Sequence, residues 1–214
     1  MKETKTNFLR LAIDSNVLQF GEFTLKSGRK SPYFFNAGLF NTGKAIAQLG
    51  RHYADTIVSS NIEFDMLFGP AYKGITLASA TASALSDKYD IDKPFAFNRK
   101  ESKAHGEGGC VVGANLKGKV LIIDDVITAG TAVREAYDLI ISEGASVAGL
   151  VISMDRQERG KSKISATGEL EQELNSPVMS IASLEDLIFF IKKDENLKSH
   201  LPNLIEYHSK YSSL

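Results

Sequence analysis

Two adjacent aspartates, Asp124 and Asp125, follow directly behind the aliphatic run 120–123 and precede a turn of small and hydroxyl residues at 128–131. Four aliphatic residues without a polar break are typical of a buried strand in a parallel sheet. Helical spacing begins behind the turn, at Thr131. In an open α/β sheet, ligands bind where the carboxyl end of a strand leads into the next helix. The sequence therefore predicts an α/β fold with a ligand site at this junction.

The residue types at this junction indicate which ligand it binds. Backbone N–H groups and hydroxyls in the turn, together with the helix N-terminus, favour a phosphate. Two carboxylates would repel that phosphate unless they hold something else, such as ribose hydroxyls or a hydrated cation. A single aspartate here is usually only a helix cap, but two adjacent acids and a complete Thr-Ala-Gly-Thr turn favour a binding site. The junction is therefore predicted to bind a sugar phosphate.

Strands alternate with helices along most of the chain, which predicts a mostly parallel central sheet flanked by helices. Strands are expected at 66–68, 94–97, 120–124, 146–154 and 177–178, and helices at 8–16, 44–59, 74–87, 131–143, 184–192 and 204–211. Residues 100–115 break all periodicity. The first ~40 residues do not alternate in this way, because β-rich runs occur at 20–25 and 31–35. They predict a small β element over the edge of the sheet.

A second strand-to-helix turn lies at 69–74, where Gly69 and Gly74 have the spacing of a nucleotide P-loop. Ile75 stands where that motif requires its lysine, which argues against an ATPase. A glycine-flanked turn that carries Lys73 and opens a helix remains suited to a second anionic group. Because carboxyl ends of parallel strands share one edge, both turns are expected to face the same site.

A third segment, 99–109, carries four basic side chains within seven residues and then three glycines in four residues. The glycines give a backbone that can swing, so a basic mobile segment could close over a polyphosphate. A solvated charged loop is the alternative. The run from Gly106 begins like a dinucleotide fingerprint, but Val111 fills the position of its third glycine, which argues against nicotinamide binding.

Composition limits the remaining possibilities. The net charge of −1 offers no overall field for nucleic acid, and no run approaches the ~18 to 20 apolar residues of a membrane span. The single cysteine, Cys110, excludes an intramolecular disulfide or a cysteine zinc site. We therefore expect a cytoplasmic protein without a nucleic-acid or membrane partner.

Taken together, these segments resemble the bacterial-type orotate phosphoribosyltransferases. Residues 120–131 are similar to the motif by which type I phosphoribosyltransferases bind phosphoribosyl pyrophosphate (PRPP). Segments 20–40, 71–74, 97–109 and 154–156 resemble the hood, pyrophosphate turn, catalytic loop and base-site arginine of the orotate enzymes. The resemblance implies the type I phosphoribosyltransferase fold in a single domain, 1–214. Within it, residues 1–40 contribute most of a β-rich hood, and residues 60–160 form the PRPP-binding core.

The resemblance also implies a role for each matching residue. The two aspartates would bind the ribose hydroxyls, the 128–131 turn the 5′-phosphate, and the 71–74 turn the pyrophosphate, across a strained peptide bond before Tyr72. Arg156 would pair with orotate in a planar bidentate manner. The residues implied for PRPP are Lys26, Tyr72, Lys73, Arg99, Lys100, Lys103, His105, Asp124, Asp125, Val126, Ile127, Thr128, Ala129, Gly130, Thr131 and Ala132. Those implied for orotate are Lys26, Phe34, Phe35, Thr128 and Arg156. Those implied for catalysis are Lys73, Lys103, His105, Asp124 and Asp125.

The implied reaction converts PRPP and orotate to orotidine 5′-monophosphate and pyrophosphate, a step of UMP biosynthesis. Mg²⁺ would be the cofactor, held by PRPP and water with no direct protein ligand. A two-fold homodimer would share its active sites through the 99–109 loop. Two alternatives stay open. A transferase for another base is disfavoured by Lys26 and Arg156, since the carboxylate of orotate needs a cation. A PRPP-sensing regulator is disfavoured by the basic loop and Lys73.

Overall fold

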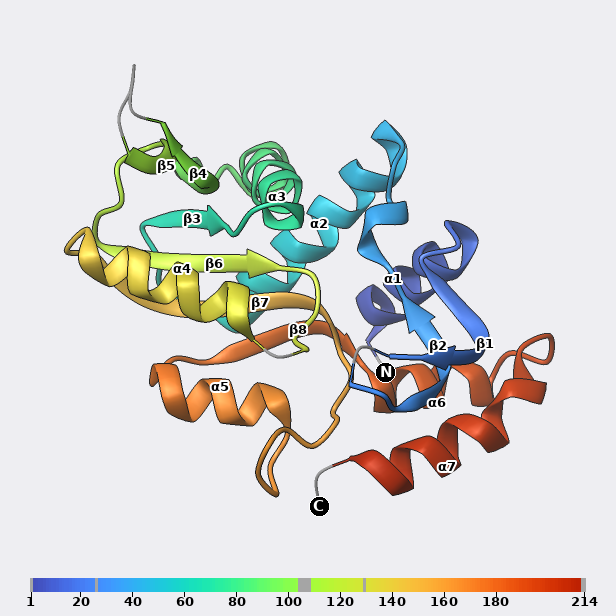
Figure 1. Ribbon diagram of the computed structural model, residues 1–214. Helices are drawn as coiled ribbons and strands as arrows, with labels where there is room; N and C mark the ends of the chain where they lie inside the picture. Colours follow the sequence, from blue (N-terminus) through green and yellow to red (C-terminus); the bar gives the residue numbers. More distant parts are fainter. Residues whose placement is uncertain (1, 26, 104–108, 129, 213–214) are drawn as a thin grey trace.

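The computed structural model describes residues 2–25, 27–103, 109–128 and 130–212, with the backbone alone for 101–103 and 109. Its centre is a six-stranded sheet in the order β5-β4-β3-β6-β7-β8 (Figure 1). These strands are β3 (Met66–Gly69), β4 (Phe95–Lys103), β5 (Gly109–Gly113), β6 (Lys119–Asp124), β7 (Ser146–Asp155) and β8 (Val178–Ser183). Every neighbouring pair is parallel except β4 and β5. The prediction of a mostly parallel α/β sheet is confirmed.

Alternate residues of the central strands face two separate hydrophobic cores, which is why β6 is apolar throughout. Leu121 and Ile123 pack against the core on one face, while Val120 and Ile122 pack against the core on the other. The first face is covered by α1 (Glu3–Asp14), α2 (Gly43–Ser60), α3 (Lys73–Tyr89), α6 (Leu184–Lys192) and α7 (Leu201–Tyr211). The second face is covered by α4 (Thr131–Ser142) and α5 (Ala166–Leu174).

The N-terminal β element forms a separate antiparallel hairpin of β1 (Leu18–Thr24) and β2 (Lys30–Phe35). Along β2, Ser31, Tyr33 and Phe35 are buried and alternate with more exposed residues, as expected for a strand with one covered face. The hairpin lies beside the C-terminal helix α7 (Figure 1). Two short 3₁₀ helices, η1 (Ala37–Leu39) and η2 (Lys198–His200), complete the fold. The small β-rich hood expected from the sequence is confirmed.

The structure departs from the predicted elements in several places. Residues 100–113 contain the outer half of β4 and the whole of β5, where no periodicity predicted a strand. A two-stranded ladder is made by backbone groups, so the charged run 99–103 and the glycines that follow it hide the ladder from pattern analysis. Helix α5 was missed because its exposed face is strongly acidic, and α1 begins five residues before the predicted start. On α2, His52 is half-buried with its ring edge-on to Phe8.

Within the described ranges, no helix has both the length and the apolar character needed to cross a membrane.

Candidate active site

The two strand-to-helix turns lie next to each other, as predicted. Strands β3 and β6 are parallel neighbours in register from Met66 with Val120 to Phe68 with Ile122. The turns behind them therefore open on one edge of the sheet. The Nζ atom of Lys73 lies 2.6 Å from Oδ2 of Asp125, so a direct ion pair joins the two turns. The sequence predicted both residues for the site but not their contact.

Buried hydrogen bonds hold the peptide groups of both aspartates. The hydroxyl of Tyr53 on α2 donates to the carbonyl oxygen of Asp124 at 2.7 Å. The hydroxyl of Ser153 on β7 donates to the carbonyl oxygen of Asp125 at 2.6 Å. The N–H of Asp125 donates to Oδ1 of Asp124 at 2.9 Å. Tyr53 and Ser153 are fully buried, and sequence reasoning missed both because neither lies in a motif.

The carboxyl groups of Asp124 and Asp125 are themselves largely buried, at 9% and 6% exposure. Burial, and next the charge of Asp125, raises the pKa of Asp124 to about 7. Asp125 instead has the ammonium of Lys73 beside it. The site thus contains one acid that burial drives toward its neutral form and one acid with a cationic partner.

The pyrophosphate turn is built so tightly that only glycine fits at both of its ends. A Cβ on Gly69 would lie 2.0 Å from the carbonyl oxygen of Gly74, and one on Gly74 would lie 2.8 Å from the carbonyl carbon of Gly69. Oδ1 of Asn98 on β4 accepts the N–H of Ala71 at 2.7 Å. The peptide bond before Tyr72 is cis. The close contact of the two glycines and the hydrogen bond to Asn98 therefore hold this turn at the sheet edge that it shares with the phosphate turn.

Two of the residues predicted for PRPP meet at the rim of this turn. The ring of Tyr72 is 68% exposed, and Nζ of Lys100 lies 5.1 Å from its centroid, within reach of a cation–π contact. Arg99, next to Lys100 on β4, is half-buried.

The phosphate turn ends at Gly130, whose φ of 70° is the left-handed conformation that glycine adopts readily. Helix α4 then begins at Thr131 without a side-chain cap. Its first N–H groups therefore lack acceptors within the helix and favour an anion. The side chain of Thr128 is exposed, whereas that of Ile127 is buried in the core.

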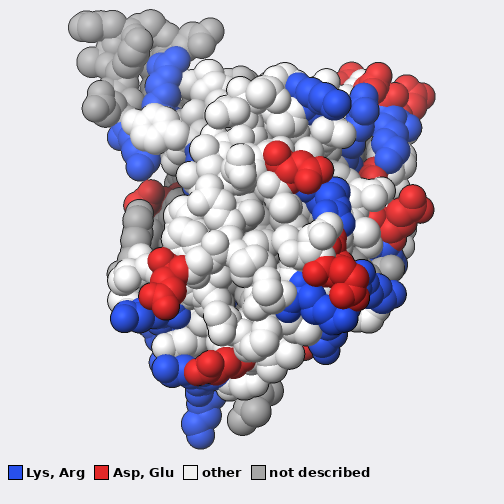
Figure 2. Space-filling model, turned by 90° about the vertical axis from the view of Figure 1, so that its right-hand side faces the viewer, with Lys and Arg blue, Asp and Glu red and all other residues white. Residues whose placement is uncertain are grey.

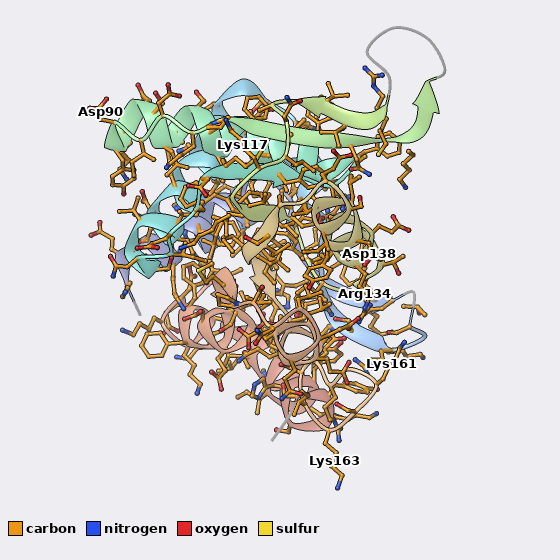
Figure 3. All side chains as sticks on the ribbon, turned by 90° about the vertical axis from the view of Figure 1, so that its left-hand side faces the viewer. Asp90, Lys117, Arg134, Asp138, Lys161 and Lys163 are labelled. Carbon is orange, nitrogen blue, oxygen red and sulfur yellow. The ribbon has the colours of Figure 1, made fainter. Side chains whose placement is uncertain are left out.

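One turn into α4, Arg134 fixes this helix to α5. Its Nε and Nη2 atoms donate to the two carboxylate oxygens of Glu173, each at 2.7 Å. Figure 3 shows Arg134 and Asp138 on the outer side of α4, with Lys161 and Lys163 on the connection between β7 and α5. The helix that carries the phosphate turn is thus fixed by a bidentate pair of the strong kind.

Arg156, predicted for orotate, follows β7 at the same edge of the sheet and is 8% exposed. Its Nε donates to Glu158 Oε1 at 2.7 Å, and its Nη2 lies 3.1 Å from Ser31 Oγ and 3.2 Å from Tyr207 Oη. Its guanidinium lies over the ring of Tyr33, 4.3 Å from the centroid. The protein therefore engages the edge of the guanidinium formed by Nε and Nη2.

The two phenylalanines predicted for orotate face opposite sides of β2. Phe34 is 38% exposed and stacks on Phe23, with ring centroids 5.5 Å apart. The ring of Phe35 is buried in the core and lies beside Phe8. Phe34 can therefore offer its ring to a ligand, whereas Phe35 can offer only its backbone.

A cavity that lies away from the strand ends is found between α1 and α2. Its volume is about 650 Å³, and none of the residues predicted for PRPP or orotate lines it. The charged and buried groups predicted for the site, Lys73, Asp124 and Asp125, instead meet at the strand ends.

Comparison with known proteins identifies the family of this chain. The model of the phosphoribosyl transferase domain family matches residues 38–174. A protein of Pseudomonas syringae pv. tomato named orotate phosphoribosyltransferase is 59% identical over 211 residues, which is 99% of each chain. A crystal structure of orotate phosphoribosyltransferase from Francisella tularensis is 48% identical, covers 97% of this chain and 100% of its own, and superposes with a TM-score of 0.86.

The chain belongs to the orotate phosphoribosyltransferase family.

More distant structures share the fold at lower identity. A UMP synthase from Leishmania donovani is 26% identical with a TM-score of 0.76 and is covered over 42% of its length. An adenine phosphoribosyltransferase from Thermoanaerobacter pseudethanolicus is 14% identical with a TM-score of 0.51, which shows the fold alone. The type I phosphoribosyltransferase fold expected from the sequence is confirmed.

Some residues implied by the family resemblance cannot be placed. Lys26, His105 and Ala129 lie outside the described residues, and only the backbone of Lys103 is described, at the outer end of β4. Val126 and Ala132 are half-buried beside the phosphate turn, and Thr131 is exposed.

The raised pKa of Asp124 predicts that this site lowers the stability of the fold. Between the ordinary carboxyl value of 3.8 and about 7, the folded state binds a proton that the unfolded state releases, so stability falls as pH rises. Asp124→Asn keeps the acceptor for the N–H of Asp125 but cannot ionise. We expect it to stabilise the fold by about 1–3 kcal/mol at pH 8.5 and by much less at pH 5.

Urea unfolding at both pH values measures this difference. Asp92→Asn is the matched control, because Asp92 is exposed. A gain that is the same at pH 5 and pH 8.5 would contradict an ionisation penalty at Asp124.

Proposed function

We propose that this chain transfers the 5-phosphoribosyl group of PRPP to orotate and releases pyrophosphate. The observation that carries the proposal is the 2.6 Å ion pair between Lys73 and Asp125. It places the cation of the pyrophosphate turn against an acid suited to ribose hydroxyls. The ribose and the pyrophosphate of one PRPP molecule would therefore meet there. The product, orotidine 5′-monophosphate, is the precursor of UMP.

The buried aspartates fit the charge that develops during such a transfer. As pyrophosphate leaves the anomeric carbon, the ribose ring becomes oxocarbenium-like, as in glycoside hydrolysis. Asp124 and Asp125 would hold the 2′- and 3′-hydroxyls and stabilise this positive charge. Preorganised charges in a water-poor site are the most effective form of such stabilisation. The hydrogen bonds from Tyr53 and Ser153 to the carbonyl oxygens of Asp124 and Asp125 fix the backbone that carries both carboxylates before the substrate arrives.

Lys73 is placed to serve the leaving group. Its ammonium is half-exposed, while Asp125 behind it is buried. We expect PRPP to share this ammonium, with one N–H on Asp125 and another on a pyrophosphate oxygen. Tyr72 and Lys100 at the rim of the same turn would contact the other pyrophosphate oxygens.

Mg²⁺ suits this site as a partner of the substrate. Lys73 already neutralises Asp125, and burial disfavours the charged form of Asp124, so neither acid is a strong direct ligand. The pyrophosphate oxygens and water would supply most of the coordination, as Mg²⁺ commonly requires. When bound, the ion neutralises the leaving group. Asp124 and Asp125 would orient it indirectly, through the ribose hydroxyls and water.

A two-fold dimer with shared sites is supported by the β4–β5 arm. Strand β4 pairs with β3 only as far as Phe97 but continues to Lys103, which pairs with Gly109 of β5. The outer part of the β4–β5 hairpin therefore extends past the rest of the sheet (Figure 3). Lys103 is three residues beyond Lys100, or about 10 Å along the strand. That length would allow Lys103 to reach the active site of a second copy of the chain.

The surface next to the site also favours a second copy. The face on the right of Figure 1 has a broad uncharged area at its centre, with charged side chains around its margins (Figure 2). A mostly uncharged cavity of about 390 Å³ between η1, α2 and α3 has Lys73 in its wall. An interface here would connect the dimer contact directly to the pyrophosphate turn. We place this reaction in the cytoplasm, since the single cysteine fits a reducing compartment.

A spectrophotometric assay of orotate consumption with PRPP, with and without Mg²⁺, tests the proposed function. We expect turnover that requires both PRPP and Mg²⁺, with uracil and adenine at least 100-fold poorer substrates, because they lack the carboxylate that Arg156 serves. Binding of PRPP without turnover of any base would instead identify a PRPP sensor. Faster turnover of uracil or adenine would overturn the assignment of orotate.

A further inference from the structure

The guanidinium of Arg156 is held by hydrogen bonds that use only part of its donor set. Nε is committed to Glu158, and Nη2 lies within hydrogen-bond distance of both Ser31 and Tyr207. Nη1 has no hydrogen-bond partner among residues 2–25, 27–103, 109–128 and 130–212. The protein thus fixes one edge of the guanidinium and leaves the Nη1 hydrogens for a ligand.

Tyr207 connects the two ends of this network. Its hydroxyl lies 2.5 Å from Oε1 of Glu158 and 3.2 Å from Nη2 of Arg156. A phenol has one proton, so it donates that proton to the carboxylate and accepts the N–H of the guanidinium. Tyr207 itself is 4% exposed, and its ring meets Tyr33 edge-on at 6.0 Å.

The charges of this network leave a net positive charge for the base. Glu158 also accepts a hydrogen bond from Nη1 of Arg29, at 2.9 Å. Two guanidiniums therefore share a single carboxylate, and one positive charge remains uncompensated within the hydrogen-bonded group. An anionic base satisfies that charge, whereas a neutral base does not.

The C-terminal helix is fastened to the same segment, so Tyr207 cannot move independently of Arg156. The N–H of Arg159 donates to the carbonyl of Tyr211 at 2.8 Å, and its Nη2 donates to the carbonyl of Lys210. Helix α7 lies alongside the β1–β2 hairpin (Figure 1). The hood, the end of β7 and α7 therefore meet at one guanidinium.

We propose that Tyr207 is a positioning residue that sets the specificity of the site for an anionic base by fixing the guanidinium of Arg156. The inference rests on the proposed function, because it concerns how orotate is selected. It gives α7, in a part of the chain where the sequence showed no functional motif, a role in base recognition.

Tyr207→Phe tests the inference, since it removes the bridging hydroxyl and keeps the buried ring. We expect the KM for orotate to rise about tenfold, the scale of a lost hydrogen bond to a charged group. The KM for PRPP should stay within about twofold, because α7 packs mainly against α6, β2 and η2 in the described part of the chain. The preference for orotate over its uncharged methyl ester, measured by competition, should fall by about the same tenfold factor.

Two further variants separate positioning from general loss of structure. Tyr211→Phe is the matched control, because it lies one turn further along α7 and packs against Tyr207. Ser31→Ala removes another partner of the same Nη2 atom and should reproduce part of the orotate defect. In a double-mutant cycle, Tyr207→Phe should add little to Arg156→Lys, since both act through one guanidinium.

The outcomes distinguish this inference from the proposed function. If the wild-type chain does not consume orotate, the proposed function fails. If the wild type is active and Tyr207→Phe behaves like Tyr211→Phe, only the inference fails. Equal increases in the KM for PRPP and orotate, or full additivity with Arg156→Lys, would show that Tyr207 supports the fold alone and would overturn the inference.

Discussion

Asp125→Asn is expected to lower kcat by about 100-fold or more, the usual loss when one charge-stabilising group is removed from a transition state. The substitution keeps the shape of the side chain and an oxygen that can still accept from Lys73. It removes the negative charge that would face the developing positive charge on ribose. Because Lys73 is half-exposed, its loss of a charged partner should change the free energy of unfolding by only about 1 kcal/mol.

Asp55→Asn is the matched control for this variant. Asp55 pairs with Lys88 at 2.5 Å, and that lysine is exposed to a similar degree, but the pair lies outside the candidate site. The two variants should therefore lose similar stability, as measured by urea unfolding, while only Asp125→Asn loses turnover. Comparable losses of turnover in both, or a turnover loss in Asp125→Asn no larger than its stability loss explains, would indicate a structural role for Asp125.

Lys103→Ala should also lower kcat by about 100-fold, with a KM for orotate near that of the wild type. The family resemblance implies that Lys103 contacts the departing pyrophosphate, and the arm formed by β4 and β5 would carry it there. Beyond Phe97 the described part of β4 no longer pairs with β3, so the fold should be unaffected. A steady-state measurement that finds near wild-type kcat would remove this residue from the mechanism.

Mixing these two inactive variants tests whether sites are shared between subunits. If the arm of one copy serves the site of the other, a dimer of Asp125→Asn and Lys103→Ala has one site with both defects and one intact site. Random mixing should then restore up to about a quarter of the wild-type activity. If each copy completes its own site, mixing restores no activity, and the shared-site arrangement is wrong.

The sequence predicted the centre of the site because its chemistry is local. The aspartates, the phosphate turn and the pyrophosphate turn each follow a buried strand, and strand ends in a parallel sheet converge. The positions of Asp125 and Lys73 could therefore be expected at one edge from their places in the chain. Their direct contact was not expected, because it depends on side-chain reach across the two turns.

The supporting residues could not be predicted, since each acts across a long separation in the sequence. Tyr53 and Ser153 lie in an ordinary helix and strand, and only folding brings their hydroxyls to the aspartate carbonyls. Glu158 occurs in a polar segment, and Tyr207 lies in a predicted helix whose pattern does not indicate a partner for its hydroxyl. The outer part of β4 was missed for a related reason, because backbone pairing leaves no hydrophobic signal on an exposed arm.

The contact between Gly69 and Gly74 limits how members of this family can diversify. Backbone atoms of each glycine occupy the space that a side chain on the other would need, so simultaneous replacement does not relieve the obstruction. Directed evolution toward a new acceptor base should therefore leave these codons untouched and concentrate its library on the hairpin and on α7. Recognition of the sugar would be inherited unchanged, while recognition of the base remains open to innovation.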